Sequence, residues 1–230
     1  KRQRRKSAGP SSRVKSKFIA IASTGVALAA ALWAFKSCGG QPPIDEKAVF
    51  SRARAKLARL MKDPPARENG FHYSVELAQL MTYAVLIGDR DAYLALRLRL
   101  VDGALLYAQN DPYVQGFLAW RFKKGHPLEA SGTTEALRFA EALFLGGKRF
   151  ARPVDRRMAR VIVAGYQRHA SIEHGTWLVR NYFNLGTRTF ATNSFLVDYD
   201  PDFIARLAAD PETPALLRRQ FRELVARSVA

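Results

Sequence analysis

The fold class is read most directly from residues 71–93, FHYSVELAQLMTYAVLIGDRDAY. Residues 73–87 are apolar on nearly every side, which is typical of a helix buried among other helices. Gly88-Asp89 predicts a turn, and a second helix follows over residues 90–108. Glu76 lies at the start of the first helix. The sequence allows it to be a catalytic acid or a polar residue that only stabilises the helix start.

Outward from this stretch, helices recur and few other elements are indicated. Further helices are predicted at residues 45–62, 133–146, 153–169, about 200–209 and 212–228. Gly146-Gly147 is expected to end the helix at residues 133–146. Residues 171–199 hold either a short strand or only ordered loop. Long helices alternate with irregular, aromatic-rich connections, so the fold class is all-α, with an α/α toroid favoured over a plain up-and-down bundle.

The N-terminal part differs in composition from the rest. The formal charge of the chain is +17, of which residues 1–17 carry +8 without a single acid. Residues 18–35 are apolar or small, and as a helix they would rise roughly 27 Å, near the lower limit for crossing a bilayer. The sequence therefore predicts a basic cytoplasmic tail, a single transmembrane helix, a linker at 36–44 and a periplasmic domain at 45–230 of a bacterial inner-membrane protein.

Several other classes are disfavoured. A retained anchor is preferred to a cleaved or lipidated signal, because Lys36 sits beside Cys38, where a lipidation signal needs uncharged residues. The four histidines are scattered singly and no glycine-rich phosphate loop is present, so neither a metal nor a cofactor is expected. The positive charge of the domain is spread out among all 20 acids, which argues against nucleic acid as a partner.

Four blocks of sequence carry a family resemblance. The first combines Ser74, the apolar MTYAVL at 81–86, Gly88-Asp89-Arg90 and Tyr93. The others are FLAWRF at 117–122, SGTTEALRFAEALFLGGKRF at 131–150 and VDYDPDFIARLA at 197–208. In this order, over residues 45–210, they resemble segments of glycoside hydrolase family 8, the bacterial cellulases and chitosanases.

The resemblance implies an (α/α)₆ barrel that cleaves a β-1,4-glycan with inversion. One carboxylic acid then protonates the leaving oxygen while a carboxylate activates water. Glu76 and Glu135 are the candidate catalytic acids. Aligned without a gap, however, the acids of the family fall on Val75 and Thr134, and a displacement of one residue turns a helical side chain by about 100°. The roughly 185 residues after the linker predict seven or eight helices where the family has twelve, so an incomplete toroid is expected, with apolar faces covered by another chain.

Three aromatic residues, Trp120, Tyr113 and Phe117, form either a sugar-stacking platform or ordinary core packing. Glu129 and Glu135 are also candidate substrate-binding carboxylates. The favoured function is a non-catalytic structural or accessory subunit of a membrane protein complex. The alternatives are a membrane-tethered inverting β-1,4-glycan hydrolase and a glycan-binding module. The expected partners are the lipid bilayer through residues 18–35, other subunits of the complex and a polysaccharide.

Overall fold

The computed structural model describes residues 45–106, 111–173 and 176–228. The predicted basic tail, transmembrane helix and linker therefore lie outside the described residues. Within those ranges, no helix has the length and the apolar character needed to cross a bilayer. Phe50–Ala230 form one compact unit.

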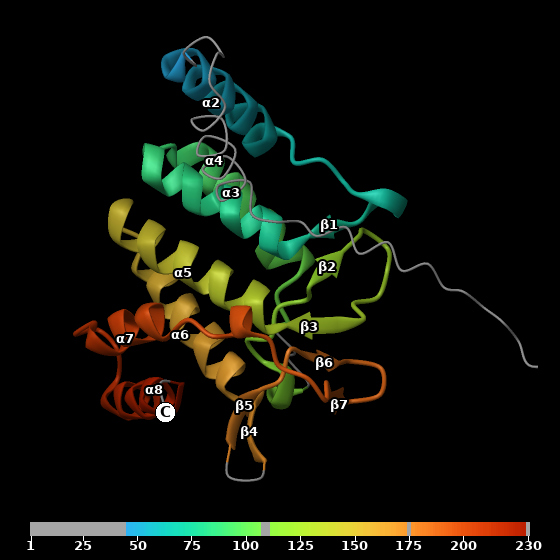
Figure 1. Ribbon diagram of the computed structural model, residues 1–230, viewed down its shortest axis with the longest axis vertical. Coiled ribbons are helices and arrows are strands. Elements are labelled where there is room, and N and C mark those ends of the chain that lie inside the picture. Colours follow the sequence, from blue (N-terminus) through green and yellow to red (C-terminus); the bar gives the residue numbers. More distant parts are fainter. Residues whose placement is uncertain (1–44, 107–110, 174–175, 229–230) are drawn as a thin grey trace, which may run out of the picture. The chain divides into compact units, whose positions relative to one another are not determined.

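Helices dominate the described part of the chain. They are α2 (Glu46–Lys62), α3 (Ser74–Ile87), α4 (Arg90–Gly103), α5 (Thr133–Arg149), α6 (Pro153–Gln167), α7 (Pro201–Ala209) and α8 (Ala215–Ser228). Helix α3 packs against α4 and α5, α5 packs against α6, and α7 packs against α8. Helices α3 and α5 lie side by side and both begin next to the short strands (Figure 1). Successive helical hairpins thus pack next to one another, which agrees with the toroid-like arrangement expected from the sequence.

The prediction of an all-α fold is wrong in one respect, because seven short strands accompany the helices within the described ranges. They are β1 (His72–Tyr73), β2 (Arg121–Phe122), β3 (Ala130–Gly132), β4 (Ala170–Glu173), β5 (Thr176–Val179), β6 (Tyr182–Asn184) and β7 (Thr189–Phe190). All pairs are antiparallel, in the orders β1-β2, β3-β6-β7 and β4-β5. Strands of two to four residues are too short to show alternation in the sequence, and most of them pair with distant residues.

Two helix ends differ from the prediction for a packing reason. Helix α5 continues through Gly146-Gly147 to Arg149. A Cβ atom on Gly146 would lie 2.2 Å from the ring of Tyr93, so this glycine allows α4 and α5 to approach closely. Helix α4 already ends at Gly103, where the ring of Phe122 occupies the space of a Cβ atom at 2.3 Å.

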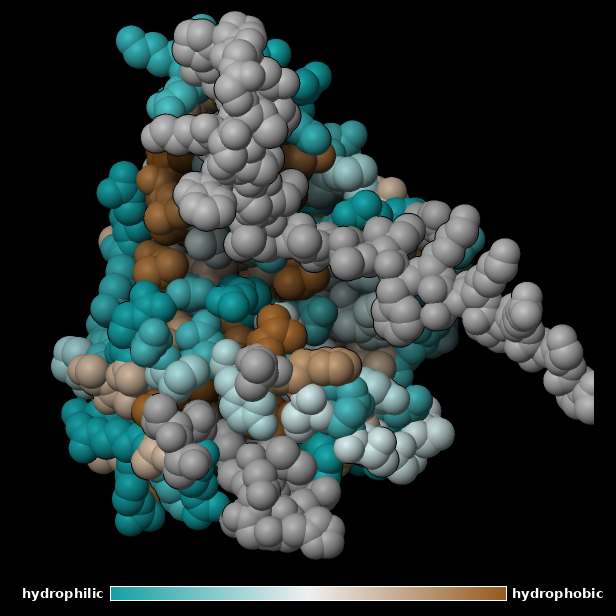
Figure 2. All heavy atoms as spheres, in the orientation of Figure 1, coloured by the Kyte–Doolittle hydropathy of each residue, from teal (hydrophilic) through white to brown (hydrophobic). Residues whose placement is uncertain are grey.

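The core lies between the helices, and part of the apolar surface remains uncovered. Leu77 and Met81 of α3 are buried in the same core as Phe139 and Leu143 of α5, and each such side chain contributes about 1.5–3 kcal/mol of burial free energy. Leu86, near the end of α3, is 71% exposed. Figure 2 shows apolar residues over α3, α4 and α5 on one face, beside hydrophilic ones. Apolar side chains are thus exposed on part of this face.

Candidate functional site

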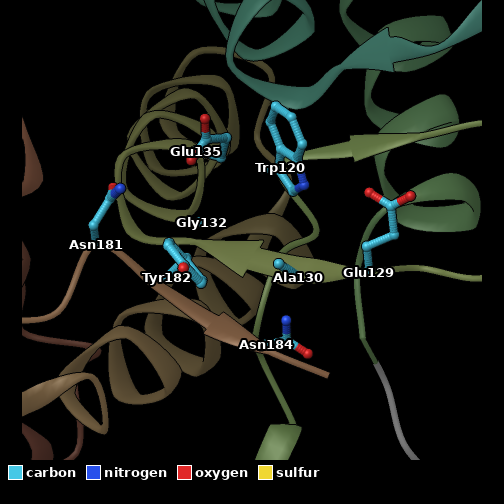
Figure 3. Close-up of a pocket in the computed structure, with 8 residues that line it drawn as sticks. All are labelled: Trp120, Glu129, Ala130, Gly132, Glu135, Asn181, Tyr182 and Asn184. Atoms are coloured by element: carbon cyan, nitrogen blue, oxygen red, sulfur yellow. The ribbon is translucent and has the colours of Figure 1, made fainter. Parts of the chain in front are cut away.

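A cleft of about 440 Å³ opens where helix α5 begins (Figure 3). It is lined by Trp120, Glu129, Ala130, Gly132, Glu135, Asn181, Tyr182 and Asn184. Strands β3 and β6 supply its floor, since Ala130 pairs with Asn184 and Gly132 pairs with Tyr182. Successive strand residues face opposite sides, so the intervening Ser131 is buried beneath the floor.

Glu135 is the acid at the centre of this cleft. It is the third residue of α5, and its carboxyl group folds back over Gly132, where a Cβ atom would lie 1.9 Å from Oε2. The backbone N–H of Gly132 donates a hydrogen bond to the Leu118 carbonyl. This N–H is therefore not available as a donor to the Glu135 carboxyl group. Burial raises the pKa of Glu135 to about 7, with a smaller contribution from the charge of Asp198 and an opposing one from its own backbone N–H. The side chain can therefore hold or release a proton near neutral pH.

Asp198 accepts hydrogen bonds from the first residues of the same helix. No sequence pattern had singled it out as a site residue. It is fully buried. Its Oδ1 accepts hydrogen bonds from the hydroxyl groups of Thr133 at 2.8 Å and Thr134 at 2.9 Å, and its Oδ2 accepts one from the backbone N–H of Phe195 at 2.8 Å. Three donors satisfy this carboxylate, so its position is defined by the protein alone.

Glu76 has a different environment. It is the third residue of α3, and it accepts a hydrogen bond from Arg67 Nε at 3.0 Å within an ion pair. Its side chain is 26% exposed and does not line the cleft. The start of α3 is joined to the cleft wall through Ser74, whose backbone N–H donates to the Trp120 carbonyl at 3.0 Å. A role of Glu76 as proton donor stays a prediction, and its pairing with Arg67 does not favour it.

The aromatic residues predicted to stack on sugars do not lie together. Trp120 lines the cleft and meets the ring of Tyr73 edge to face at 5.4 Å. Phe117 is 1% exposed and lies 4.4 Å from the ring of His169, so of the two alternatives left open by the sequence this residue takes core packing. Tyr113 packs on the same cluster, outside the cleft.

His169 belongs to that aromatic core and not to a reaction centre. It is 2% exposed, and burial lowers its pKa to about 3. Its Nε2 lies 3.4 Å from the hydroxyl of the equally buried Ser131. This pair is closed off from any ligand, so it serves packing.

The remaining acid of the cleft, Glu129, is neutralised at its rim. It accepts hydrogen bonds from Arg121 at 2.7 Å and 3.2 Å. The Arg121 guanidinium lies 4.4 Å from the ring centres of both Trp120 and Phe71, so the cation is held between two aromatic faces.

Three polar lining residues come from the segment that the sequence left open between strand and loop. These are Asn181, Tyr182 and Asn184. The Asn184 side-chain oxygen accepts from the backbone N–H groups of Gly186 and Thr187 at 2.9 Å, which forms the β6–β7 turn. The only signal in the sequence was the richness of residues 171–199 in asparagine and aromatic residues. Throughout the described ranges, no group of three or more potential metal ligands comes together.

Comparison with solved structures identifies the architecture. The chain matches the endo-β-1,4-glucanase CMCax from Acetobacter xylinum with a TM-score of 0.54 and 21% identity, covering 75% of this chain and 56% of that enzyme. The endoglucanase Cel10 from Klebsiella pneumoniae, a family 8 glycosyl hydrolase, matches with a TM-score of 0.53 and 15% identity, over 76% of this chain and 57% of the other. The fold resembles that of glycoside hydrolase family 8. The resemblance inferred from the four sequence blocks is thus confirmed.

The likeness is partial. An α-amylase from Clostridium perfringens also matches, with a TM-score of 0.59 and 15% identity, over 75% of this chain and 51% of the enzyme. The chain therefore spans a little more than half of the length of these enzymes. Neither a protein-family model nor a curated protein matches the sequence. Because the identities are low, these matches establish the family 8-like fold alone.

Proposed function

We propose that the family 8-like domain binds a polysaccharide chain in the cleft at the start of α5 without hydrolysing it. The observation that carries this proposal is the state of the acids. Inverting hydrolysis requires a protonated acid and a free carboxylate that activates water on the opposite side of the sugar ring. Of the acids that line the cleft, Glu129 is paired with Arg121, which leaves Glu135 alone.

The other nearby acids do not supply the second carboxylate. Asp198 is buried and saturated by three donors, and Glu76 is paired with Arg67 away from the cleft lining. A single unpaired acid is suited to hydrogen-bonding a sugar hydroxyl, since it donates when protonated and accepts when ionised.

The remaining lining suits a carbohydrate ligand. Trp120 and the 40%-exposed Tyr182 offer aromatic faces, and Asn181 points toward the cleft (Figure 3). Binding sites of this kind combine apolar contact area with a few polar groups that set the orientation of the ligand. The expected ligand is a β-linked glycan, by analogy with the endoglucanases that share the fold.

Trp120→Ala tests the binding role. We expect about tenfold weaker binding of the neutral polymer hydroxyethylcellulose, because one aromatic contact is worth about 1–1.5 kcal/mol. The matched control is Tyr113→Ala, which removes an exposed aromatic ring outside the cleft and is expected to leave affinity unchanged. Affinity gel electrophoresis of the full chain measures both. Equal affinities for wild type and Trp120→Ala would contradict the proposal.

A hydrolase is the second candidate, and the raised pKa of Glu135 is the observation that favours it. A carboxyl group that is still protonated near pH 7 can serve as a general acid. Release of reducing ends from the polymer, abolished by Glu135→Gln, would establish this alternative and overturn the binding-only proposal.

The cellular role that we propose is that of a non-catalytic accessory subunit in a membrane complex, held at the bacterial inner membrane with the domain on the periplasmic side. The apolar segment 18–35 and the basic residues 1–17 support this proposal. Extraction of the full chain from membranes in mild detergent tests it. A protein that runs alone in every preparation would speak against a subunit role.

A further inference from the structure

A second and larger groove, of about 1140 Å³, opens beside strands β1 and β2. Its walls come from the segment after α2, from the end of α4 and from the turn after β2. In the β1–β2 ribbon His72 pairs with Phe122, and both line this groove. The neighbouring pair, Tyr73 and Arg121, instead contacts Trp120 of the first cleft. The ribbon therefore has one side toward each cavity, as alternation along a strand requires.

The two cavities are neighbours along the same stretch of chain. Trp120 lines the cleft and Phe122, two residues later, lines the groove. On the returning segment, Leu128 lines the groove and Glu129 lines the cleft. The two cavities therefore adjoin at residues 120–122 and 128–129, one on each side of the β1–β2 ribbon.

The groove differs from the cleft in its charge. Three cations line it, Arg99, Lys123 and Lys124, against the two carboxylates of Asp63 and Asp102. Asp102 lies one helical turn from Arg99 on α4, where it offsets part of that charge. The lining thus has one more cation than carboxylates, and two of its three cations, Lys123 and Lys124, lie on the turn after β2.

That turn presents its cations in a defined way. Lys123 Nζ donates to the Asn69 carbonyl at 2.8 Å, which holds the ammonium group against the groove wall. Lys124 is exposed, and Gly125 follows with φ of +77° and no atom within 4 Å of a Cβ position, so the turn is open toward solvent. Burial and the charge of Arg99 lower the pKa of His72, so its ring adds no positive charge at neutral pH.

We propose that this groove binds acidic substituents of the glycan whose backbone lies in the cleft, so that the preferred ligand is an anionic β-linked polysaccharide. This inference rests on the proposed glycan-binding function. Exposed cations attract such groups by Coulomb forces. In 0.1 M salt these forces are screened at separations beyond about 10 Å. The neutral backbone is then held by Trp120 and Tyr182, while the groove selects for charge.

Two polymers with the same β-1,4-glucan backbone separate the two parts of this proposal. Carboxymethylcellulose is anionic and hydroxyethylcellulose is neutral. In the double variant Arg99→Glu/Lys124→Glu of the full chain, we expect affinity for carboxymethylcellulose at low salt to fall about tenfold, because two attractive charges of the groove become repulsive. Affinity for hydroxyethylcellulose should change less than twofold.

The matched control is Arg219→Glu/Arg222→Glu, which reverses two exposed charges on α8 and leaves the groove intact. The basic residues 1–17 are the same in all variants, so their attraction to the anionic polymer cancels in the comparison. Inorganic phosphate, added at constant ionic strength, distinguishes a site for any free anion from a site that needs the glycan. If the site needs the glycan, carboxymethylcellulose should stay bound when phosphate is present.

Each outcome bears on a defined claim. If both double variants weaken carboxymethylcellulose binding equally, or if the groove variant weakens both polymers equally, the charge-selective groove is refuted while the cleft proposal stands. If phosphate displaces the polymer stoichiometrically, the groove is a free-anion site and the inference is refuted. If the wild type binds neither polymer, the proposed function fails and the inference fails with it.

Discussion

Helices α3 and α5 begin with the same local sequence pattern, but the glutamate near the start of each helix has a different environment. In each, a hydroxyl residue starts the helix and a glutamate follows two positions later: Ser74 and Glu76 in one, Thr133 and Glu135 in the other. Glu76 meets Arg67 at the surface, whereas Glu135 faces a cleft with buried Asp198 nearby. Identical local positions therefore lead to an ion pair in one case and a carboxyl group with a raised pKa in the other.

The cause is the segment that packs on each helix start. The loop before β1 brings Arg67 to α3. At α5 the neighbours are Gly132, Trp120 and the segment containing Asp198, which together supply no cation to Glu135 in the described part of the chain. A carboxylate without a compensating charge is disfavoured as it loses water, and it keeps its proton to a higher pH.

The largest effect on stability is expected from Asp198→Ala, which removes the carboxylate that accepts hydrogen bonds from the first residues of α5. Three hydrogen bonds to a buried carboxylate are lost, although the hydroxyl groups of Thr133 and Thr134 each keep a backbone carbonyl as acceptor, at 2.9 Å and 3.4 Å. The free energy of unfolding should therefore fall by about 3 kcal/mol. Urea denaturation measures the loss. Asp198→Asn retains an acceptor oxygen and should lose less; an equal loss in both variants would contradict this account.

The next effect is the pH dependence of Glu135→Gln. Glu135 holds its proton to about pH 7 in the folded protein but only to about pH 4.5 when unfolded, so the folded state binds more protons between these values. The free energy of unfolding therefore falls as the pH rises through this window, and the glutamine variant escapes this loss. Thermal and urea unfolding should show the variant about 3 kcal/mol more stable than wild type at pH 9. Below pH 4.5 the variant and the wild type should have the same free energy of unfolding. A constant difference in this free energy at all pH values would contradict the raised pKa of Glu135.

Gly132→Ala tests whether the position of the Glu135 carboxyl group decides its pKa. The added methyl group would occupy the place of Oε2 and push the carboxyl group toward solvent. We expect the pKa of Glu135 to move down from about 7 toward its ordinary value, because rehydration favours the ionised form. Carbon-detected NMR titration of the glutamate side chains follows this change. An unchanged titration would show that the position over Gly132 is not the cause.

The smallest effect belongs to Glu76→Gln. An ion pair at this degree of exposure contributes about 0.2–1 kcal/mol, so unfolding should change by less than 1 kcal/mol. Glycan affinity should stay the same, because Glu76 does not line the cleft. Loss of binding in this variant, with the fold intact by circular dichroism, would place Glu76 at the ligand and reverse the contrast with Glu135.

Prediction from sequence succeeded where the signal is local. The continuous apolar stretch of α3, the Gly88-Asp89 turn before α4 and the proline at the start of α6 placed these helices to within about a residue at their starts. It failed at Gly146-Gly147, where the packing of Tyr93 outweighs the local tendency of glycine to end a helix. The sequence could not decide between core packing and sugar stacking for Phe117, because aromatic residues occur in both environments.

The amino-acid sequence by itself determined the helical character of this protein and the order of blocks that resembles family 8 hydrolases, because helix periodicity and short motifs depend on residues close together in the chain. Only the tertiary structure decided which glutamate faces the cleft, which aromatic ring remains available and how the two cavities adjoin. Those outcomes depend on contacts such as Arg67 with Glu76 and Asp198 with Thr134, in which the charge and burial of a side chain are set by residues 9 to 64 positions away.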